Sequence, residues 1–361
     1  MENRIVLELP PSDGVYRSSE GSFATLTDGR VLLAYSKFTG GYKDDAGAVI
    51  VSRVSCDGGL TWSGDTVVAA GDGTQNVMSA SLARLADGRL ALMYLAKNGP
   101  GDCRPRIRFG DESQGGGHVV WGEPVCPIEQ QGYFVVNNDR LVQLRTGRLV
   151  MPAAAKPPRP EDPGRPWLSA ATFYLSDDAG RSWRRCAGGL YEMPQPEAAA
   201  SWTGLQEPGV IELADGTMLA WARTDAGCQF AMTSADGGET WTPPARTGFV
   251  SPVSPMSLKR IAGSGLLLAL WNDHSGRFPL DAQKGRQPLV SAVSRDEGRT
   301  WENHKQVESD LSRGYHYTAI HFLADGHTLL GYCAGPKGPG RQLNTLRIRR
   351  LSTAWWAAGE P

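Results

Sequence analysis

Short apolar runs separated by glycine-containing turns recur along the whole chain. The hairpin-like segments are Ala24–Tyr35, Leu82–Tyr94, Leu141–Pro152, Val210–Trp221, Leu258–Trp271 and Ile320–Tyr332. Four of these six turns contain Asp-Gly, which between apolar runs is the strongest short-range signal for a β-hairpin. No long stretch shows the period of an amphipathic helix, so the pattern predicts a chain built from hairpins.

A second pattern, Ser-x-Asp-x-Gly-x-Thr/Ser-Trp, follows four of the hairpins. Its copies are Ser55–Trp62, Ser176–Trp183, Ser234–Trp241 and Ser294–Trp301. In the second unit it has decayed to Phe109–Trp121, and the sixth unit lacks it. The aspartate can accept hydrogen bonds from its own turn, the glycine supplies a positive φ, and the tryptophan fills space between sheets. We therefore interpret the motif as architectural rather than catalytic.

Each unit is then predicted to have four strands, A to D. The glycine turn joins A to B, and the tryptophan motif joins C to D. Six four-stranded antiparallel units predict an all-β fold, a six-bladed β-propeller. We expect Arg4–Leu9 and Thr345–Leu351 to close the ring in the final blade, so that residues 1–361 form a single domain. Two stacked β-sandwiches are the alternative, and the nearly even units argue against them.

Composition narrows the class of protein. With 40% hydrophobic and 21% charged residues, the chain has the balance of a soluble globular protein. A net charge of −1 gives no basic footprint for nucleic acid or an anionic membrane, and no apolar run is long enough to span a bilayer. Six scattered cysteines without a Cys-x-x-Cys pair indicate free thiols. We expect a cytoplasmic protein without a signal peptide, a bound metal or another cofactor.

The strand count places a set of polar residues around the axis of the propeller. Residues at the start of each A strand converge on the face opposite both series of turns. Counting back six residues from the apolar residue before each turn gives Glu20, Ser79, Asn138, Glu207, Pro255 and Tyr317. Neighbouring positions and loops on that face add Asn76, Asn137, Asp139, Lys37, Lys97, Lys156, Arg223, Asn272, Asp273, His274, Asp44, Asp45 and Arg286. The column predicts either a polar, water-filled channel mouth or an anion-binding pocket with acid/base carboxylates.

The tryptophan motif is similar to the Asp box, or BNR repeat, and most of the chain resembles the sialidase/neuraminidase superfamily of six-bladed propellers. This resemblance implies that Asp45 is the acid/base residue, with Asp44 as its neighbouring alternative. It implies that Glu207 and Tyr317 form the nucleophile pair, with Tyr315 as the near alternative.

The same resemblance implies a substrate carboxylate held by arginines, and here the chain departs from the superfamily. Arg223 and Arg286 match two arginines of the superfamily's triad, but Glu20 stands where the third is expected, with Arg17 three residues upstream. A carboxylate there would repel the substrate carboxylate, unless Glu20 pairs with Arg286 or Arg223 or binds sugar hydroxyls. Lys37 or Lys156 would then supply the missing positive charge. The remaining expected substrate contacts are Asn138, Asp139 and Asn272.

Together these residues indicate an exo-acting retaining glycosidase that hydrolyses a terminal acidic sugar, sialic acid or a related ulosonic or uronic acid. An acidic glycan is the expected partner. Two alternatives stay open. One is a propeller lyase or inverting hydrolase on uronic-acid glycans that uses Glu20 as an extra carboxylate. The other is a non-catalytic carbohydrate-binding propeller.

Overall fold

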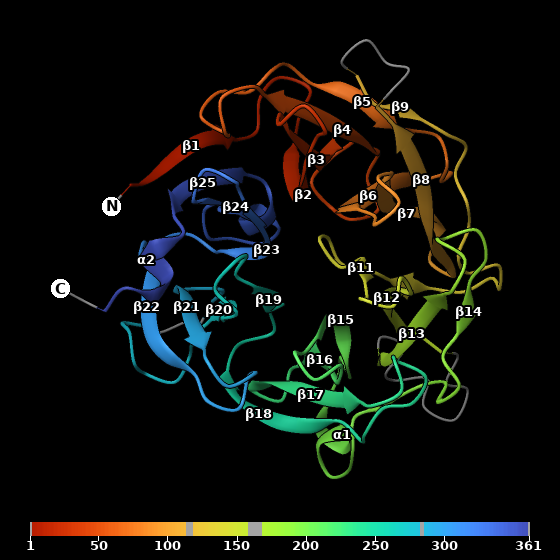
Figure 1. Ribbon diagram of the computed structural model, residues 1–361, viewed down its shortest axis with the longest axis vertical. Coiled ribbons are helices and arrows are strands. Elements are labelled where there is room, and N and C mark those ends of the chain that lie inside the picture. The colour runs from red at the N-terminus through yellow and green to blue at the C-terminus, as the bar shows by residue number, and fades with distance from the viewer. Residues whose placement is uncertain (1, 113–117, 158–167, 282–284, 360–361) are drawn as a thin grey trace.

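Six antiparallel sheets surround a central axis, which confirms the predicted six-bladed propeller (Figure 1). The computed structural model describes residues 2–112, 118–157, 168–281 and 285–359. The strands nearest the centre in Figure 1 are β2, β6, β11, β15, β19 and β23. The chain folds this way because each unit supplies strands that pair with their sequence neighbours.

The strand bounds follow the predicted units. Blade I has β2 (Arg17–Thr25), β3 (Val31–Phe38), β4 (Ala48–Ser55) and β5 (Thr66–Ala69), and blade II has β6 (Asn76–Arg84), β7 (Leu90–Gly99), β8 (Asp102–Asp111) and β9 (Val120–Trp121). Blade III has β10 (Phe134–Val135), β11 (Val142–Gln143), β12 (Leu149–Ala155), β13 (Ala170–Ser176) and β14 (Arg184–Arg185), and blade IV has β15 (Gln206–Glu212), β16 (Met218–Arg223), β17 (Cys228–Ser234) and β18 (Ala245–Val250). Blade V has β19 (Ser257–Arg260), β20 (Leu267–Asn272), β21 (Leu289–Ser294) and β22 (Glu302–Glu308), and blade VI has β23 (His316–Phe322), β24 (His327–Cys333), β25 (Leu346–Ser352) and β1 (Asn3–Leu9).

The ring is closed by the two ends of the chain. Strand β1 pairs antiparallel with β25, in a register that runs from Asn3 opposite Leu351 to Leu9 opposite Leu346. The outermost strand of blade VI therefore comes from the N-terminus, as predicted. Backbone hydrogen bonds thus join residues from opposite ends of the sequence.

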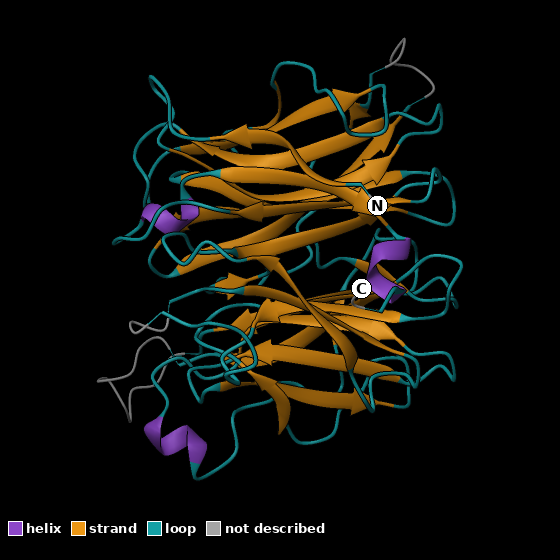
Figure 2. Ribbon diagram, turned by 90° about the vertical axis from the view of Figure 1, so that its left-hand side faces the viewer, coloured by secondary structure: helices purple, strands orange, loops and turns teal. Residues whose placement is uncertain are grey.

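Helices are short in the described part of the chain. They are α1 (Glu197–Ala200), α2 (Ala354–Ala357) and the 3₁₀ turn η1 (Arg341–Leu343). Figure 2 shows the strands of all blades running between two faces covered by loops. No helix among these residues has the length and apolar character needed to cross a bilayer.

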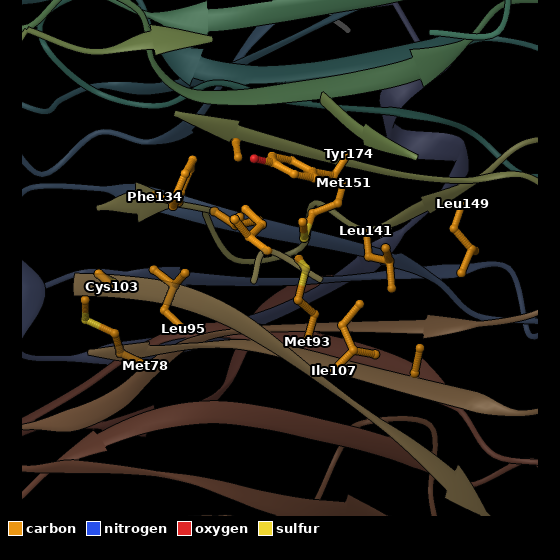
Figure 3. Close-up of a cluster of buried hydrophobic side chains, with 14 of the residues drawn as sticks. Met78, Met93, Leu95, Cys103, Ile107, Phe134, Leu141, Leu149, Met151 and Tyr174 are labelled. Carbon is orange, nitrogen blue, oxygen red and sulfur yellow. The ribbon is translucent and has the colours of Figure 1, made fainter. Parts of the chain in front are cut away.

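Apolar side chains pack between neighbouring blades rather than in one central core. Figure 3 shows such a cluster between blades II and III, where Met93, Ile107 and Met151 are almost completely buried. Strand β12 is buried along its whole length because sheets cover both of its faces, which explains its nearly continuous apolar sequence. Each fully buried large apolar side chain contributes roughly 1.5–3 kcal/mol.

The Asp-box motif is tied together by its own side chains. Asp57 accepts hydrogen bonds from the backbone N–H groups of Leu60 (3.0 Å) and Thr61 (2.9 Å) and from the Thr61 hydroxyl (2.6 Å). These hydrogen bonds, chiefly from Thr61, lower the pKa of Asp57 to about 2. The Trp62 indole donates to the Gly59 carbonyl (3.2 Å). The side chains of Asp57, Thr61 and Trp62 thereby hold the turn.

Gly59 links the first Asp box to the last blade, and its replacement tests that packing. Its φ is +87°, and an added Cβ would lie 2.7 Å from a side-chain atom of the fully buried Leu329 on β24. We predict that Gly59→Ala lowers the free energy of unfolding by about 2–4 kcal/mol, because backbone strain and overpacking add. Gly64→Ala, where nothing lies within 4 Å of the added Cβ, is the matched control. Equal urea denaturation midpoints for the two variants would contradict this packing.

Candidate active site

In four of the inner strands, a β-bulge interrupts the pairing with the next strand of the blade at equivalent positions. The register shifts lie between Ser19 and Ser22 in β2, Met78 and Ser81 in β6, Gln206 and Gly209 in β15, and His316 and Ala319 in β23. The residues at these bulges are left-handed although none is glycine: Glu20 (φ 53°), Ser79 (61°), Glu207 (47°) and Tyr317 (58°). A bulge re-aims a side chain and twists the strand, and such strain clusters at functional sites.

The third and fifth blades differ from this pattern. In blade III the left-handed residue is Asp139 (φ 58°), one position beyond the Asn138 that the strand count selects. The count fails by one residue because the inner strand is split into β10 and β11, both of which pair with β12. In blade V the column position is Pro255, whose ring excludes a positive φ.

A cavity of about 260 Å³ lies at the level of the bulges, on the face opposite the Asp boxes. Its lining is mostly polar and comes from several blades. The lining residues are Glu20, Asp44, Met78, Ser79, Leu95, Tyr133, Val135, Asn137, Ala154, Lys156, Ser169, Gln206, Glu207, Arg223, Arg286, Tyr317 and Leu343.

Tyr317, Glu207 and Arg223 form a chain of hydrogen bonds in this cavity. The Tyr317 hydroxyl donates to Glu207 Oε1 at 3.0 Å, and Arg223 donates to Glu207 Oε2 at 2.9 Å. Burial and the Glu207 charge raise the pKa of Tyr317 above its ordinary value. The phenol is therefore neutral at rest, and a carboxylate is in contact with its proton.

Arg286 is a second arginine close to Tyr317. Its guanidinium carbon is 5.9 Å from the centre of the Tyr317 ring. Burial and the neighbouring Arg223 charge lower the pKa of Arg286, so an anionic ligand would be favourable here. Tyr315, the alternative nucleophile, points elsewhere: it packs against Tyr332, its hydroxyl donates to the Asp310 carbonyl, and it does not line the cavity.

Glu20 faces the cavity, but its ion-pair partner is Arg17 rather than Arg286 or Arg223. Arg17 donates to Glu20 Oε2 at 2.7 Å and to Asp44 Oδ1 at 2.5 Å. Burial raises the pKa of Glu20 against the opposing charge of Arg17. For Asp44 burial is opposed by the charge and hydrogen bond of Arg17 together with the charges of Lys97 and Arg286, and the pKa is lowered. With only 1% of its side chain exposed, Arg17 lies behind these carboxylates and does not line the cavity.

The loop between β3 and β4 distinguishes the two adjacent aspartates. Both are exposed, but Asp44 lines the cavity, whereas Asp45, the expected acid/base residue, does not. Lys37 also lies outside the cavity, because its ammonium pairs with Asp65 at 2.7 Å.

The other residues that we expected to contact the substrate, Asn138, Asn272 and Asp139, do not line this cavity. They form hydrogen bonds within the protein instead. Asn138 donates to the carbonyls of Gly21 (2.7 Å) and Tyr317 (3.0 Å). Asn272 donates to the carbonyl of Tyr315 at 2.9 Å. Asp139 accepts from Ser22 Oγ (2.9 Å), from the Ile320 N–H (3.1 Å) and from Lys259. These residues fix the inner strands on which the cavity side chains stand.

The strand count did not select Tyr133 and Gln206, although both line the cavity. Tyr133 carries the Lys156 ammonium 4.2 Å from its ring centre. Burial, reinforced by the Lys97 charge, lowers the pKa of Lys156 to about 8. A count that gives one position per inner strand cannot reach Tyr133, which precedes β10. In the described part of the chain, no group of three or more His, Cys, Asp or Glu side chains is placed to hold a metal ion.

The fold and this arrangement define a sialidase-like propeller with a polar, charged cavity. The family model described as the BNR repeat-like domain matches residues 29–330, and the chain belongs to that family. No curated protein matches the sequence.

Solved structures share the fold at low identity. A protein of unknown function from Dyadobacter fermentans is 18% identical with a TM-score of 0.72, and the alignment covers 97% of this chain and 99% of the other. The NanB sialidase from Streptococcus pneumoniae is 15% identical with a TM-score of 0.70, over 98% of this chain and 71% of the other. The Trypanosoma rangeli sialidase is 16% identical with a TM-score of 0.69, over 96% of this chain and 57% of the other.

The Arg17 ion pairs give a stability prediction. Removing a buried guanidinium leaves Glu20 without a counter-charge, which costs about 3–5 kcal/mol, whereas exposed pairs contribute little. We expect Arg17→Met to lose about that much in chemical denaturation, and Arg17→Met/Glu20→Gln to recover part of the loss. Arg295→Met breaks the exposed pair with Glu302 and is the control. Equal losses for Arg17→Met and Arg295→Met would refute the assignment.

Proposed function

We propose that the protein is a retaining exo-glycosidase that hydrolyses a terminal acidic sugar, either sialic acid or a related ulosonic or uronic acid. The observation that carries the proposal is the hydrogen bond from Tyr317 to Glu207, in a cavity that also holds Arg223 and Arg286. A pure binding site has no need of a phenol in contact with a base. The sialidase-like fold supports the same reading.

The chemistry follows from charge. The anomeric carbon of a 2-keto sugar acid carries a carboxylate that repels an anionic nucleophile but not a neutral phenol. Sialidases with a tyrosine nucleophile are a recognised exception among glycosidases. In the first step Glu207 accepts the Tyr317 proton as the phenol oxygen attacks the anomeric carbon, and the aglycone oxygen leaves with a proton. Water, activated by a base, then attacks the anomeric carbon of this tyrosyl glycoside, the Tyr317 oxygen leaves and takes back the proton from Glu207, and the two inversions give net retention.

Asp44 is assigned as the residue that protonates the leaving oxygen and later activates water. It is the member of the Asp44–Asp45 pair that lines the cavity, and its side chain is 60% exposed. Paired with Arg17 it is a carboxylate, the form that the second step requires. Because the first step requires the protonated form and Arg17 lowers the Asp44 pKa, we expect turnover to be favoured by acidic pH.

Arg286, Arg223 and Lys156 are assigned to the substrate carboxylate. Arg286 forms no ion pair within the described residues, whereas Arg223 shares its charge with Glu207. Guanidinium groups suit a planar carboxylate. Lys156 then supplies the third positive charge, since Lys37 is held by Asp65. Glu20, next to this cluster, would accept hydroxyl groups of the sugar.

One observation favours a second candidate function. Glu20, Asp44 and Glu207 place three carboxylates around one cavity, which suits a lyase or an inverting hydrolase on uronic-acid glycans. Product analysis separates the candidates, because a lyase leaves an unsaturated sugar and an inverting enzyme releases the opposite anomer.

Removal of the phenol oxygen tests the nucleophile. We predict that Tyr317→Phe lowers hydrolysis of a responsive aryl glycoside at least about a hundredfold with an unchanged melting temperature. The substrates to compare are aryl glycosides of N-acetylneuraminic acid, its deaminated analogue, glucuronic acid and a neutral sugar. Tyr315→Phe is the matched control and keeps activity, since its hydroxyl bonds a backbone carbonyl away from the cavity. Unchanged turnover in Tyr317→Phe would exclude a tyrosine mechanism.

The Lys156 pKa of about 8 gives a pH prediction. The ammonium faces Tyr133, Lys97, Cys103, Glu207 and Asp44, and it is charged below that pKa. KM for an acidic glycoside should therefore be constant below about pH 7 and rise about tenfold as the pH passes 8. Lys156→Arg should keep the low KM at higher pH, and Lys156→Met should lose it at every pH. Identical KM profiles for the three proteins would remove Lys156 from the binding site.

A further inference from the structure

A larger cavity opens at the other end of the channel, among the inner strands of blades III, IV and V. Its volume is about 610 Å³, and it reaches the A–B turns of those blades. Its lining shares no residue with the candidate active site. The lining residues are Asp139, Arg140, Leu141, Val142, Gln143, Arg145, Val210, Ile211, Glu212, Leu213, Ala214, Trp221, Ser257, Leu258, Lys259, Arg260 and Gly265.

Arg140 is the unusual member of this lining. Only 3% of it is exposed, and among the described residues its guanidinium makes a single hydrogen bond, from Nη2 to the Met256 carbonyl at 2.7 Å. Its Nε has no hydrogen-bond partner in that part of the chain. The guanidinium carbon lies 5.6 Å from the Trp221 ring centre. Burial lowers the pKa of Arg140, and the charges of Asp139 and Glu207, which do not form an ion pair with it, oppose this shift only in part.

The other cations of the cavity already have carboxylate partners. Arg145 pairs with Glu212 at 3.1 Å, Lys259 with Asp139 at 2.7 Å, and Arg260 with Glu297 at 2.6 Å. Within the described residues Arg140 is the lining cation that has no carboxylate within 4 Å. Buried charges in proteins are normally paired, so this guanidinium points to an anion from outside the chain.

We propose that this cavity binds a small organic carboxylate, with Arg140 as its counterion. One unpaired guanidinium matches a monovalent anion, whereas a dianion such as phosphate would also face Asp139 and Glu212. Apolar side chains, among them Leu141, Val210 and Leu258, line the same cavity, so the rest of the ligand is a compact apolar body. This proposal does not depend on the function assigned to the other cavity.

Calorimetric titration of the full chain with benzoate, isobutyrate and inorganic phosphate tests the proposal. We expect the two carboxylates to bind and phosphate to bind more weakly or not at all. Arg140→Met should weaken benzoate binding at least about tenfold, the loss of one charge-assisted hydrogen bond. Leu213→Trp, which narrows the cavity without touching Arg140, should weaken it as well.

Two controls separate this cavity from other sites. Arg286→Met removes an arginine of the candidate active site and should leave unchanged the component of benzoate binding that is lost in Arg140→Met. Arg295→Met removes an exposed, paired cation that lines neither cavity and should do the same. If Arg140→Met does not fold, the Leu213→Trp titration and a benzoate-dependent rise in wild-type melting temperature carry the test. Absence of benzoate binding, equal binding by Leu213→Trp, loss of the Arg140-dependent component in Arg286→Met, or tighter binding of phosphate would overturn the proposal.

Discussion

The candidate active site depends on a backbone constraint: four inner strands are forced into left-handed bulges at equivalent positions. Glu20, Ser79, Glu207 and Tyr317 adopt positive φ values that side chains other than glycine rarely take. Each costs roughly 1–3 kcal/mol, so it persists only where the surrounding structure holds it. Here each bulge is flanked on both sides by regular pairing with the next strand of its blade. Asn138 adds support by donating to the carbonyls of Gly21 and Tyr317.

Charge is the second constraint on this site. A single buried guanidinium, Arg17, serves both Glu20 and Asp44, so it is not available to a substrate. The anion-binding capacity of the cavity then rests on Arg286, on Arg223 beside Glu207, and on Lys156 above Tyr133. A site of this kind differs from three arginines around one carboxylate. Under the proposed function, the ligand must tolerate a carboxylate, Glu20, close to its own acidic group.

Turn chemistry made the fold predictable from the sequence. Asp-Gly turns and tryptophan motifs report local backbone geometry, which a sequence encodes directly, and the register that they define located Glu20, Ser79, Glu207 and Tyr317 at equivalent positions. The count failed at Asn138, because splitting of the inner strand of blade III shifts the left-handed residue to Asp139. No local pattern reveals such a split.

Contacts between distant segments were the other part that the sequence did not predict. Arg17, on β2, forms an ion pair with Asp44 in the loop between β3 and β4. That loop places Asp44 rather than Asp45 in the lining of the cavity. Lys37 lies two residues from Tyr35, so both side chains point to the same face of β3, where Asp65 accepts hydrogen bonds from both. The alternation of side chains along β3 therefore places Lys37 outside the site. The sequence alone does not show that Asp65 is its partner.

The proposed mechanism has Tyr317 attack the anomeric carbon of an acidic sugar. Mass spectrometry of the protein after incubation with a 2,3-difluorinated sialic acid, which slows release of the covalent intermediate, tests this attack. We expect a glycosyl adduct on the peptide that contains Tyr317. An adduct on Glu20, Asp44 or Glu207, or release of the inverted product without any adduct, would contradict it.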